Sequence, residues 1–357
     1  MRVALIYNLK GSAPVDEDAP PDAQAEFDSL RTIEGIERAL QAGGHEVVRL
    51  EADRTLLDTI RQARPDFCFN IAEGLGGDSR ESHVPALLEM LRIPYTASKV
   101  LAHAISLDKA VTKRIWRDAG LPTAPFQVLI RGDEPLERQL AFPLFVKPVR
   151  EGSGMGINEH SIVHNQTELR AQAQWVIRTY RQPALVETFL PGREFTVGLI
   201  GNTLAPGERR HSSLYDERGF HVFPIQEIDT TVGASRVVYN TLAKTFSVGE
   251  EGAPAFICPA KIPIRLERRI KRLAVDAFEA IGALDVARVD FRLDAAGRPQ
   301  LMEINTLPGM NPGFSDLCLV AEAEGITHPV LINEILTLAA ARYGMAHLCR
   351  PSDQLRL

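Results

Sequence analysis

The chain contains 357 residues, with 40 Lys and Arg against 46 Asp and Glu, so its formal net charge is −6. The length suggests two or three folding units, and the acidic balance argues against a general binder of nucleic acid or anionic membranes, which would need a basic surplus. No segment is apolar for long enough to span a bilayer, the first residues are typical of a strand rather than a signal peptide, and the four cysteines lie far apart. We therefore expect a cytoplasmic protein with reduced thiols.

Strand-like and helix-like patterns alternate over residues 1–105. The spacing of apolar residues predicts strands at Val3–Tyr7, His45–Leu50 and Asp66–Ile71, and helices at Ser29–Ala42, Leu56–Gln62 and Val84–Leu91. Strands that alternate with helices imply a parallel sheet with helices on its faces, and hence an α/β fold. The segment Gly11–Pro21 is rich in Pro and Asp, has no period and is expected to be a mobile loop.

A change of composition near Ser106 predicts a boundary, and we expect units at residues 1–105, 106–184 and 185–357. The middle unit is predicted to contain a helix at Leu107–Ala119, strands at Pro125–Ile130 and Pro143–Pro148, and a helix at Thr167–Thr179. The last unit is predicted to contain strands at Leu185–Glu187 and Glu194–Ile200, an irregular stretch at about 206–254, a helix at Ile264–Ile281, a hairpin at Val286–Ile304 and a helix at His328–Tyr343.

The predicted hairpin carries the most informative polar residues. With its turn centred between Ala296 and Gly297, antiparallel register sets Asp290 opposite Glu303, and directly opposed side chains lie ~5 Å apart at Cβ. Two carboxylates that close repel each other unless a cation lies between them. Together with the amide oxygen of Asn305 they form an oxygen set that suits Mg²⁺ held jointly with phosphates. A surface hairpin with solvated charges is the alternative.

A strand also leads into a glycine-rich loop. Three alternating glycines, Gly152, Gly154 and Gly156, offer backbone N–H groups that can approach phosphate oxygens with no Cβ in the way. The spacing matches neither a P-loop nor a dinucleotide fingerprint, so a plain flexible turn is the alternative. Lys147 is the stronger signal, because a cation that points inward from an apolar strand requires a partner, and a bound phosphate is a natural one.

A third segment begins at Leu185 and passes through a Pro-Gly turn to Glu194. The end of such a strand can present backbone groups to an adenine edge, and acidic residues there can accept hydrogen bonds from ribose hydroxyls. Standing alone, the segment is equally typical of a hairpin turn with exposed acids. The order of the motifs along the chain nevertheless suits a Mg·ATP site. The lysines and the glycine loop come first, and the strand end and the acidic hairpin follow.

In these motifs the chain resembles the ATP-grasp superfamily and, within it, the D-alanine–D-alanine ligase family. The resemblance rests on the segments around Lys109, Lys147, Glu187, Asp290 and Glu303 and covers nearly the whole chain. It implies a three-domain ATP-grasp fold and an ATP-dependent carboxylate–amine ligase that forms an amide, or dipeptide, bond through an acyl phosphate. It also implies ATP, two Mg²⁺ ions with Mn²⁺ as a substitute, small amino-acid or carboxylic-acid substrates, and a homodimer.

The resemblance further implies roles for individual residues. Arg288, Ser153 and the backbone N–H of Gly309 are expected to be catalytic, with Arg288 and Gly309 stabilising the oxyanion of a tetrahedral intermediate. ATP is expected to contact Lys109, Lys147, Glu151, Ser153, Glu187, Leu190, Glu194 and Lys244, and the metal ions to be bound by Asp290, Glu303 and Asn305. Substrate contacts are expected from Glu26, Asp28, Glu73 and Ser315.

The chain departs from the family pattern on the substrate side. The family's His-Gly-x-x-Gly-Glu-Asp-Gly turn appears here as the stretch from Glu73 to Glu81, which lacks the His and is two residues longer. The family's first-strand glutamate is also missing from its usual place, and Glu26 or Asp28 is the substitute. D-alanine is therefore the default substrate, and a different pair of amino or carboxylic acids is the alternative. A nucleotide-binding protein without ligase chemistry is a second alternative, disfavoured because Asp290 and the other chemical residues are present.

Overall fold

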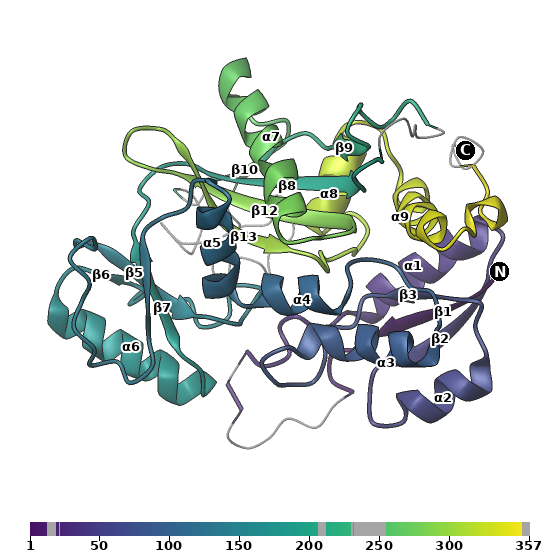
Figure 1. Ribbon diagram of the computed structural model, residues 1–357, viewed down its shortest axis with the longest axis horizontal. Helices are drawn as coiled ribbons and strands as arrows, with labels where there is room; N and C mark the ends of the chain where they lie inside the picture. The colour runs from purple at the N-terminus through teal and green to yellow at the C-terminus, as the bar shows by residue number, and fades with distance from the viewer. Residues whose placement is uncertain (13–18, 21, 206–211, 230, 232–254, 352–357) are drawn as a thin grey trace.

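The computed structural model describes residues 1–12, 19, 20, 22–205, 212–229, 231 and 255–351. These residues form three sheets (Figure 1). Most of the loop expected at Gly11–Pro21, and Lys244, lie outside the described residues.

The first sheet is parallel, as predicted, with the strand order β2-β1-β3. Its strands are β1 (Arg2–Tyr7), β2 (Glu46–Glu51) and β3 (Phe67–Asn70), and its helices are α1 (Leu30–Ala42), α2 (Leu56–Ala63) and α3 (His83–Leu91). Successive residues of β1 face opposite sides of the sheet, so Val3 and Leu5 pack with α1 while Ala4 and Ile6 pack with α2 and α3. Helix α1 begins at Ser29, whose hydroxyl accepts a hydrogen bond from a backbone N–H of the first turn.

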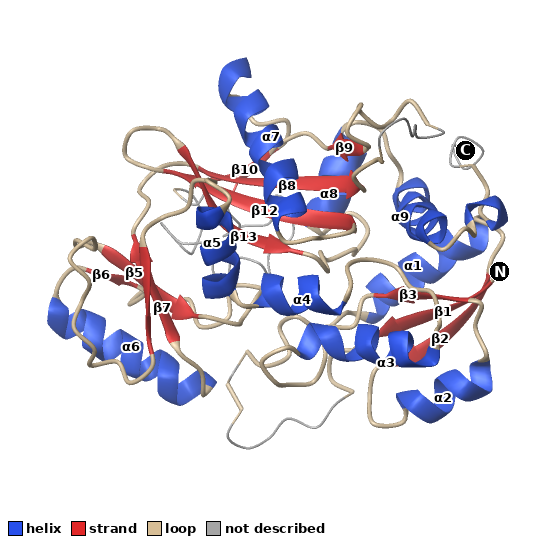
Figure 2. Cartoon of the chain, in the orientation of Figure 1, coloured by secondary structure: helices blue, strands red, loops and turns tan. Residues whose placement is uncertain are grey.

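The second sheet is antiparallel and has the order β4-β7-β5-β6. Its strands are β4 (Phe126–Leu129), β5 (Leu144–Pro148), β6 (Ile162–Val163) and β7 (Ala184–Thr188), and α6 (Gln166–Tyr180) covers one face (Figure 2). Since β7 pairs with both β4 and β5, the boundary expected between residues 184 and 185 falls inside a strand. The sheet itself therefore extends the middle unit to Thr188.

The helix expected at Leu107–Ala119 is α5 (Lys109–Asp118). A further helix that was not predicted, α4 (Val100–Leu107), precedes it, and the two meet at Asp108. Asp108 has an extended backbone, and its carboxylate accepts a hydrogen bond from Val111 N at 2.9 Å, so it ends one helix and caps the next. The break directs Lys109, the first residue of α5, toward the glycine loop.

The third sheet has the order β11-β10-β8-β12-β13, with β9 paired to β8. Its strands are β8 (Glu194–Gly201), β9 (Phe220–Val222), β10 (Gln226–Asp229), β11 (Ala255–Ile257), β12 (Asp285–Leu293) and β13 (Pro299–Asn305). The stretch expected to be irregular thus contains β9 and β10, which were missed because they are short and pair with the distant strand β8.

Helices cover both faces of the third sheet. Helix α7 (Ile264–Ala280) packs on one face, and α8 (Asp316–Ala323) packs on the other together with α9 (His328–Arg342). Helix α9 also packs against α1, so the last helix of the chain shares a core with the first sheet (Figure 1). A short 3-10 turn at Ala346–Leu348 follows it.

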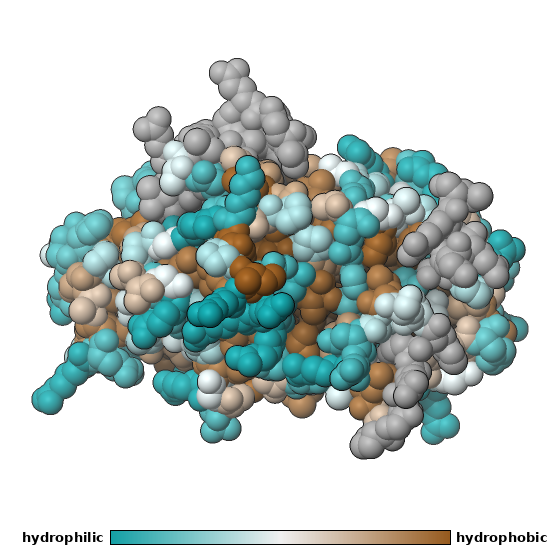
Figure 3. Space-filling view, turned by 90° about the horizontal axis from the view of Figure 1, so that it is seen from above, coloured by the Kyte–Doolittle hydropathy of each residue, from teal (hydrophilic) through white to brown (hydrophobic). Residues whose placement is uncertain are grey.

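In the described part of the chain, no helix combines the length and the apolar character that crossing a membrane requires. The face seen in Figure 3 mixes polar side chains with small apolar patches.

Candidate active site

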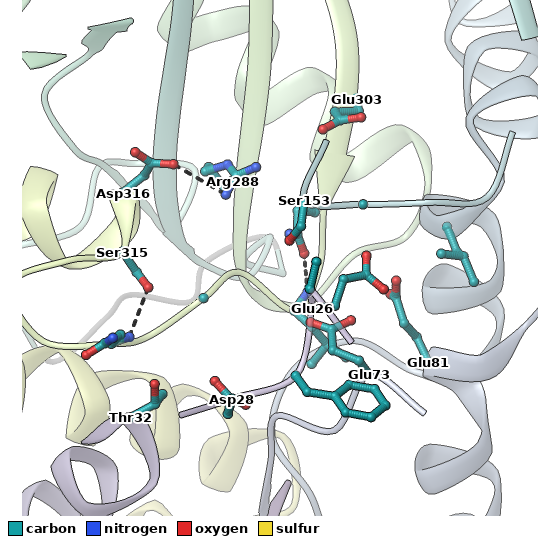
Figure 4. A pocket seen from close by; sticks show the side chains of 18 of the residues that line it. Glu26, Asp28, Thr32, Glu73, Glu81, Ser153, Arg288, Glu303, Ser315 and Asp316 are labelled. Atoms are coloured by element: carbon teal, nitrogen blue, oxygen red, sulfur yellow. Dashed lines mark hydrogen bonds and ion pairs between the residues drawn. The ribbon is translucent and has the colours of Figure 1, made fainter. Parts of the chain in front are cut away.

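A cavity of about 430 Å³ lies where the three units meet (Figure 4). Its walls gather most of the residues that the sequence singled out: Glu26, Asp28, Glu73, Lys109, Ser153, Arg288, Glu303, Asn305, Gly309 and Ser315. Long loops and separate units supply these side chains, which are up to 289 positions apart in the numbering of the chain, from Glu26 to Ser315. The structure therefore brings the candidate catalytic, metal and substrate residues into one space.

A second, smaller cavity of about 50 Å³ adjoins the first. It is lined by the predicted phosphate and ribose residues Lys109, Lys147, Glu151 and Glu194, together with Asp290 and Glu303. Lys109 and Glu303 line both cavities, so the two spaces meet at these side chains. Glu187 and Leu190 line neither of them.

The acidic hairpin has the predicted pairing of its two carboxylates, but its turn differs from the prediction. Asp290 is opposite Glu303, but the turn is centred one half-residue earlier than expected, as the pairing of Leu293 with Pro299 shows. A one-residue bulge at Met302 restores the expected register on the functional side of the hairpin. Both carboxylates line the smaller cavity as a result.

Basic side chains lie beside these carboxylates. Arg288 donates hydrogen bonds to both oxygens of Asp290, at 3.0 Å from Nε and 2.9 Å from Nη2, and Thr196 Oγ1 donates another at 2.6 Å. Lys109 Nζ lies 3.4 Å from Glu303 Oε2. Arg288 and Lys109 thus place positive charge beside the two acids, where the sequence analysis expected a metal ion.

The oxygen set fits a magnesium ion that is shared with phosphate. Among the described residues, no three His, Cys, Asp or Glu side chains are grouped so that they could hold a metal ion by themselves. Asp290, Glu303 and Asn305 supply only oxygen ligands from protein, and Mg²⁺ typically completes such a set with water and substrate phosphates. Asn305 Oδ1 accepts a hydrogen bond from Leu307 N at 2.9 Å, which orients the amide.

A buried ion cluster lies beside the smaller cavity. Glu187 accepts Lys147 Nζ at 2.9 Å and Lys113 Nζ at 3.1 Å, and all three side chains are buried. Burial alone would raise the pKa of Glu187, but the two ammonium groups lower it to about 2. Lys113 was not predicted as a site residue, although it lies one helical turn after Lys109 on the same helix.

The glycine loop is joined to the N-terminal unit. Arg80, in the 3-10 turn before α3, donates to Glu26 Oε2 at 2.6 Å, to Glu151 Oε2 at 3.1 Å and to the carbonyl of Arg150 at 2.9 Å. Lys109 Nζ donates to the carbonyl of Glu151. Arg80 was also not predicted as a site residue. The one signal for it in the sequence was its position among the acidic residues of the Glu73–Glu81 stretch.

Close packing explains why a glycine stands at position 152 of this loop. A Cβ added to Gly152 would overlap Glu26 Oε1, which Arg80 holds in place. Gly156 N donates to Asp22 Oδ2 at 3.1 Å, and the Tyr180 hydroxyl donates to the same carboxylate. The loop therefore lies over the cavities, in contact with the N-terminal unit.

The remaining predicted residues occupy the opposite wall. Ser315 Oγ accepts a hydrogen bond from Asn311 N at 3.0 Å, and a Cβ on Gly309 would lie 2.9 Å from that oxygen. Ser315 and Gly309 thus face the same part of the larger cavity, beside Arg288 (Figure 4). Glu194 lies 3.3 Å from Arg292 Nη1 on the nucleotide side.

Comparison with known proteins agrees with the fold. Residues 115–337 match the family described as D-ala D-ala ligase C-terminus. The chain is 33% identical over 353 residues to the uncharacterized protein y4sG of Sinorhizobium fredii, covering 96% of this chain and 98% of that protein. It is 33% identical over 329 residues to the D-alanine–D-alanine ligase of Pelotomaculum thermopropionicum, covering 89% and 93%. The structure of D-alanine–D-alanine ligase from Bacillus anthracis complexed with ATP shares its fold, with a TM-score of 0.71 and 23% identity over 96% of this chain and 99% of that one.

Proposed function

The chain belongs to the D-alanine–D-alanine ligase family, and we propose that it joins the carboxylate of one amino acid to the amine of another, with D-alanine as the reference substrate. Membership of this family makes it an ATP-dependent ligase with an ATP-grasp fold. The observation that carries the proposal is the meeting of two cavities at Lys109 and Glu303, one lined by lysines and the other by Arg288 and Ser315. Such a junction can hold a phosphate donor against a carboxylate acceptor.

The nucleotide side follows from the smaller cavity. Lys109 and Lys147 would bind the phosphates, and Glu194 the ribose, while the adenine contacts of Glu187 and Leu190 and the phosphate contact of Lys244 are predictions from the family pattern. Asp290, Glu303 and Asn305 would hold two Mg²⁺ ions. When bound, the metal neutralises phosphate charge and so favours attack by an anionic carboxylate.

The larger cavity would hold the acceptor side of the reaction. One oxygen of the substrate carboxylate attacks the terminal phosphorus of ATP and releases ADP, and the amine of the second amino acid then attacks the acyl carbon and releases phosphate. Arg288 and the Gly309 N–H would hold the oxyanion that forms at that carbon. The glycine loop with Ser153 would exclude water, which would otherwise hydrolyse the acyl phosphate.

Phosphate release tests the proposal. With ATP and Mg²⁺ we expect release to depend on added amino acids, tried as pairs with D-alanine first. Release only with other acids would retain the ligase and replace D-alanine. No release with any pair, together with tight ATP binding, would favour the non-catalytic nucleotide-binding alternative.

Two conservative variants test the metal assignment. Asp290→Asn and Glu303→Gln should each lower kcat by about 100-fold or more, because each removes an anionic ligand of the metal that would neutralise the reacting phosphates. Their thermal unfolding should stay near that of the parent chain. Asp78→Asn removes an exposed carboxylate from outside both cavities and is the matched control. Full activity in either of the first two variants would show that the metal is held elsewhere.

Two further expectations from the family pattern are proposals. A homodimer is testable by sedimentation, and a cytoplasmic location by fractionation of the source cells.

A further inference from the structure

The larger cavity has an acidic wall on the side of the N-terminal unit. It is formed by Glu26, Asp28, Glu73 and Glu81, and Figure 4 shows the three glutamates side by side. The opposite side of the cavity is balanced, because Lys109 lies near Glu303 and Arg288 lies 3.5 Å from Asp316. The acidic wall is therefore the part of the site with unmatched charge.

Glu81 is a deeply buried member of this wall with no hydrogen-bonded cation in the part of the chain that the structure describes. It is 7% exposed, and what remains exposed faces the cavity. The nearest basic nitrogen among the described residues is His103 Nδ1 at 3.8 Å, beyond hydrogen-bond distance, and that nitrogen is 2.8 Å from Thr306 Oγ1. Burial lowers the pKa of His103 to about 3, so the ring is neutral and forms no ion pair. A carboxylate buried to this extent and aimed into a cavity calls for a cationic partner.

Few cations are available to the other three acids. Arg80 pairs with Glu26 but is shared with Glu151, and Lys10 lines the cavity with an exposed side chain. No described residue forms an ion pair with Glu73. Two cations face four carboxyl groups, so two of the acids have no counter-charge among the described residues when they ionise.

The raised pKa values of three of these acids agree with the shortage of counter-charges on the wall. Burial, and then the charge of Glu26, raises the pKa of Glu81 to about 8. Burial and the neighbouring glutamates raise the pKa of Glu73, and burial raises that of Asp28 to about 7. An incoming cation would relieve this shortage.

We propose that the first-substrate subsite of this ligase takes an amino acid with a second cationic group, an amine or guanidinium on its side chain, which Glu73 and Glu81 bind. The α-ammonium of an ordinary amino acid supplies a counter-charge for one of these two acids and leaves the other without one. A basic amino acid supplies the second. This inference rests on the proposed function, since it presumes that the larger cavity binds an amino acid.

Binding and turnover with isosteric pairs test the inference. Ornithine and norleucine have side chains of nearly equal length, one ending in an ammonium and the other in a methyl group. We would measure the binding of both, in D and L forms, by calorimetry with Mg²⁺ and a non-hydrolysable ATP analogue, and would measure phosphate release with D-alanine as the second amino acid. One enantiomer of ornithine is expected to bind at least about ten-fold more tightly than norleucine.

Two variants locate the preference. Glu73→Gln and Glu81→Gln should each remove most of the ratio between ornithine and norleucine while the thermal unfolding temperature stays at or above that of the parent chain. Asp78→Asn takes the same charge from the same turn outside the cavity and should retain the ratio. Equal binding of ornithine and norleucine, or a ratio that persists in both Gln variants, would overturn the inference.

The two proposals fail in different ways. Phosphate release with D-alanine alone, without preference for ornithine, leaves the ligase intact and removes the basic substrate. Absence of phosphate release with every pair removes the proposed function, whatever the binding measurements give.

Discussion

Glu187 illustrates how one residue serves both stability and the site. Its carboxylate lies between Lys113 and Lys147, and this arrangement fixes the ammonium of Lys147 at the edge of the nucleotide cavity. The sequence suggested a phosphate as the partner of Lys147, whereas the structure supplies a carboxylate from the neighbouring strand β7. A phosphate would therefore bind to a lysine that is already held in position.

Loss of the Glu187 charge should destabilise the protein. Glu187→Gln leaves two buried ammonium groups without a counter-charge, and we expect the free energy of unfolding to fall by about 3 kcal/mol. Urea denaturation measures this change. Asp133→Asn, which breaks the exposed pair with Arg131, should cost less than about 1 kcal/mol. Equal small losses in both variants would mean that the buried cluster adds nothing to stability.

The same cluster predicts a pH dependence. Because the pKa of Glu187 is about 2 in the folded protein and 4.5 when unperturbed, the folded state binds this proton less readily. Its stabilisation is present above about pH 4.5 and is lost as the pH falls toward 2. The difference in unfolding free energy between the parent chain and Glu187→Gln should therefore shrink over that range. A difference that stays constant would contradict the assignment.

At the scale of elements, two short segments determine the geometry of the site. The bulge at Met302 places Asp290 opposite Glu303, and the loop after β5 carries Gly152 to the side chain of Glu26. Each of these two features depends on one residue. The bulge residue shifts the strand register by one position, and in the loop a Cβ would occupy the space of a carboxylate oxygen.

Gly152→Ala should displace the glycine loop. We expect kcat/KM to fall by about ten-fold or more with little change in thermal unfolding, because the loop must move away from Glu26 while the sheets stay intact. Steady-state kinetics and a melting curve check both parts. Gly76→Ala is the control, as a Cβ there would meet no atom within 4 Å. Normal kinetics in Gly152→Ala would show that the side chain of Glu26 can move aside without loss of activity.

At the scale of the whole molecule, Arg80 connects the units around the cavities. It links Glu26 of the N-terminal unit to Glu151 and the carbonyl of Arg150 in the middle unit. Glu26 lines the larger cavity and Glu151 the smaller one, so the ion cluster touches both substrate spaces.

Arg80→Gln should weaken both substrate sites together. Removal of the guanidinium leaves two buried carboxylates unpaired, and we expect KM for ATP and for the first amino acid to rise by about ten-fold each. Hydrogen exchange of residues 150–156 should also become faster. Arg131→Gln, at an exposed ion pair, should change neither. A rise in only one KM would show that Arg80 serves a single site.

Much of this could be predicted from local patterns. Alternation and helical spacing predicted the parallel sheet and its helices, and the period of two along each strand, with the turn near Gly297, predicted that Asp290 faces Glu303. Helix α4 was missed because its sequence is almost uniformly apolar and shows no amphipathic period, and β10 was missed because its partner β8 is distant in sequence. Neither feature has a local signal of sufficient strength.

The sequence by itself determined the family and most of the elements, because periodicity and motif spacing are properties of neighbouring positions. Only the tertiary structure decided which charges meet: Lys113 with Glu187, Arg80 with Glu26, and Glu81 with an open cavity. The physical reason is that the environment of a charge depends on burial and on partners from other elements, and no short-range pattern encodes either.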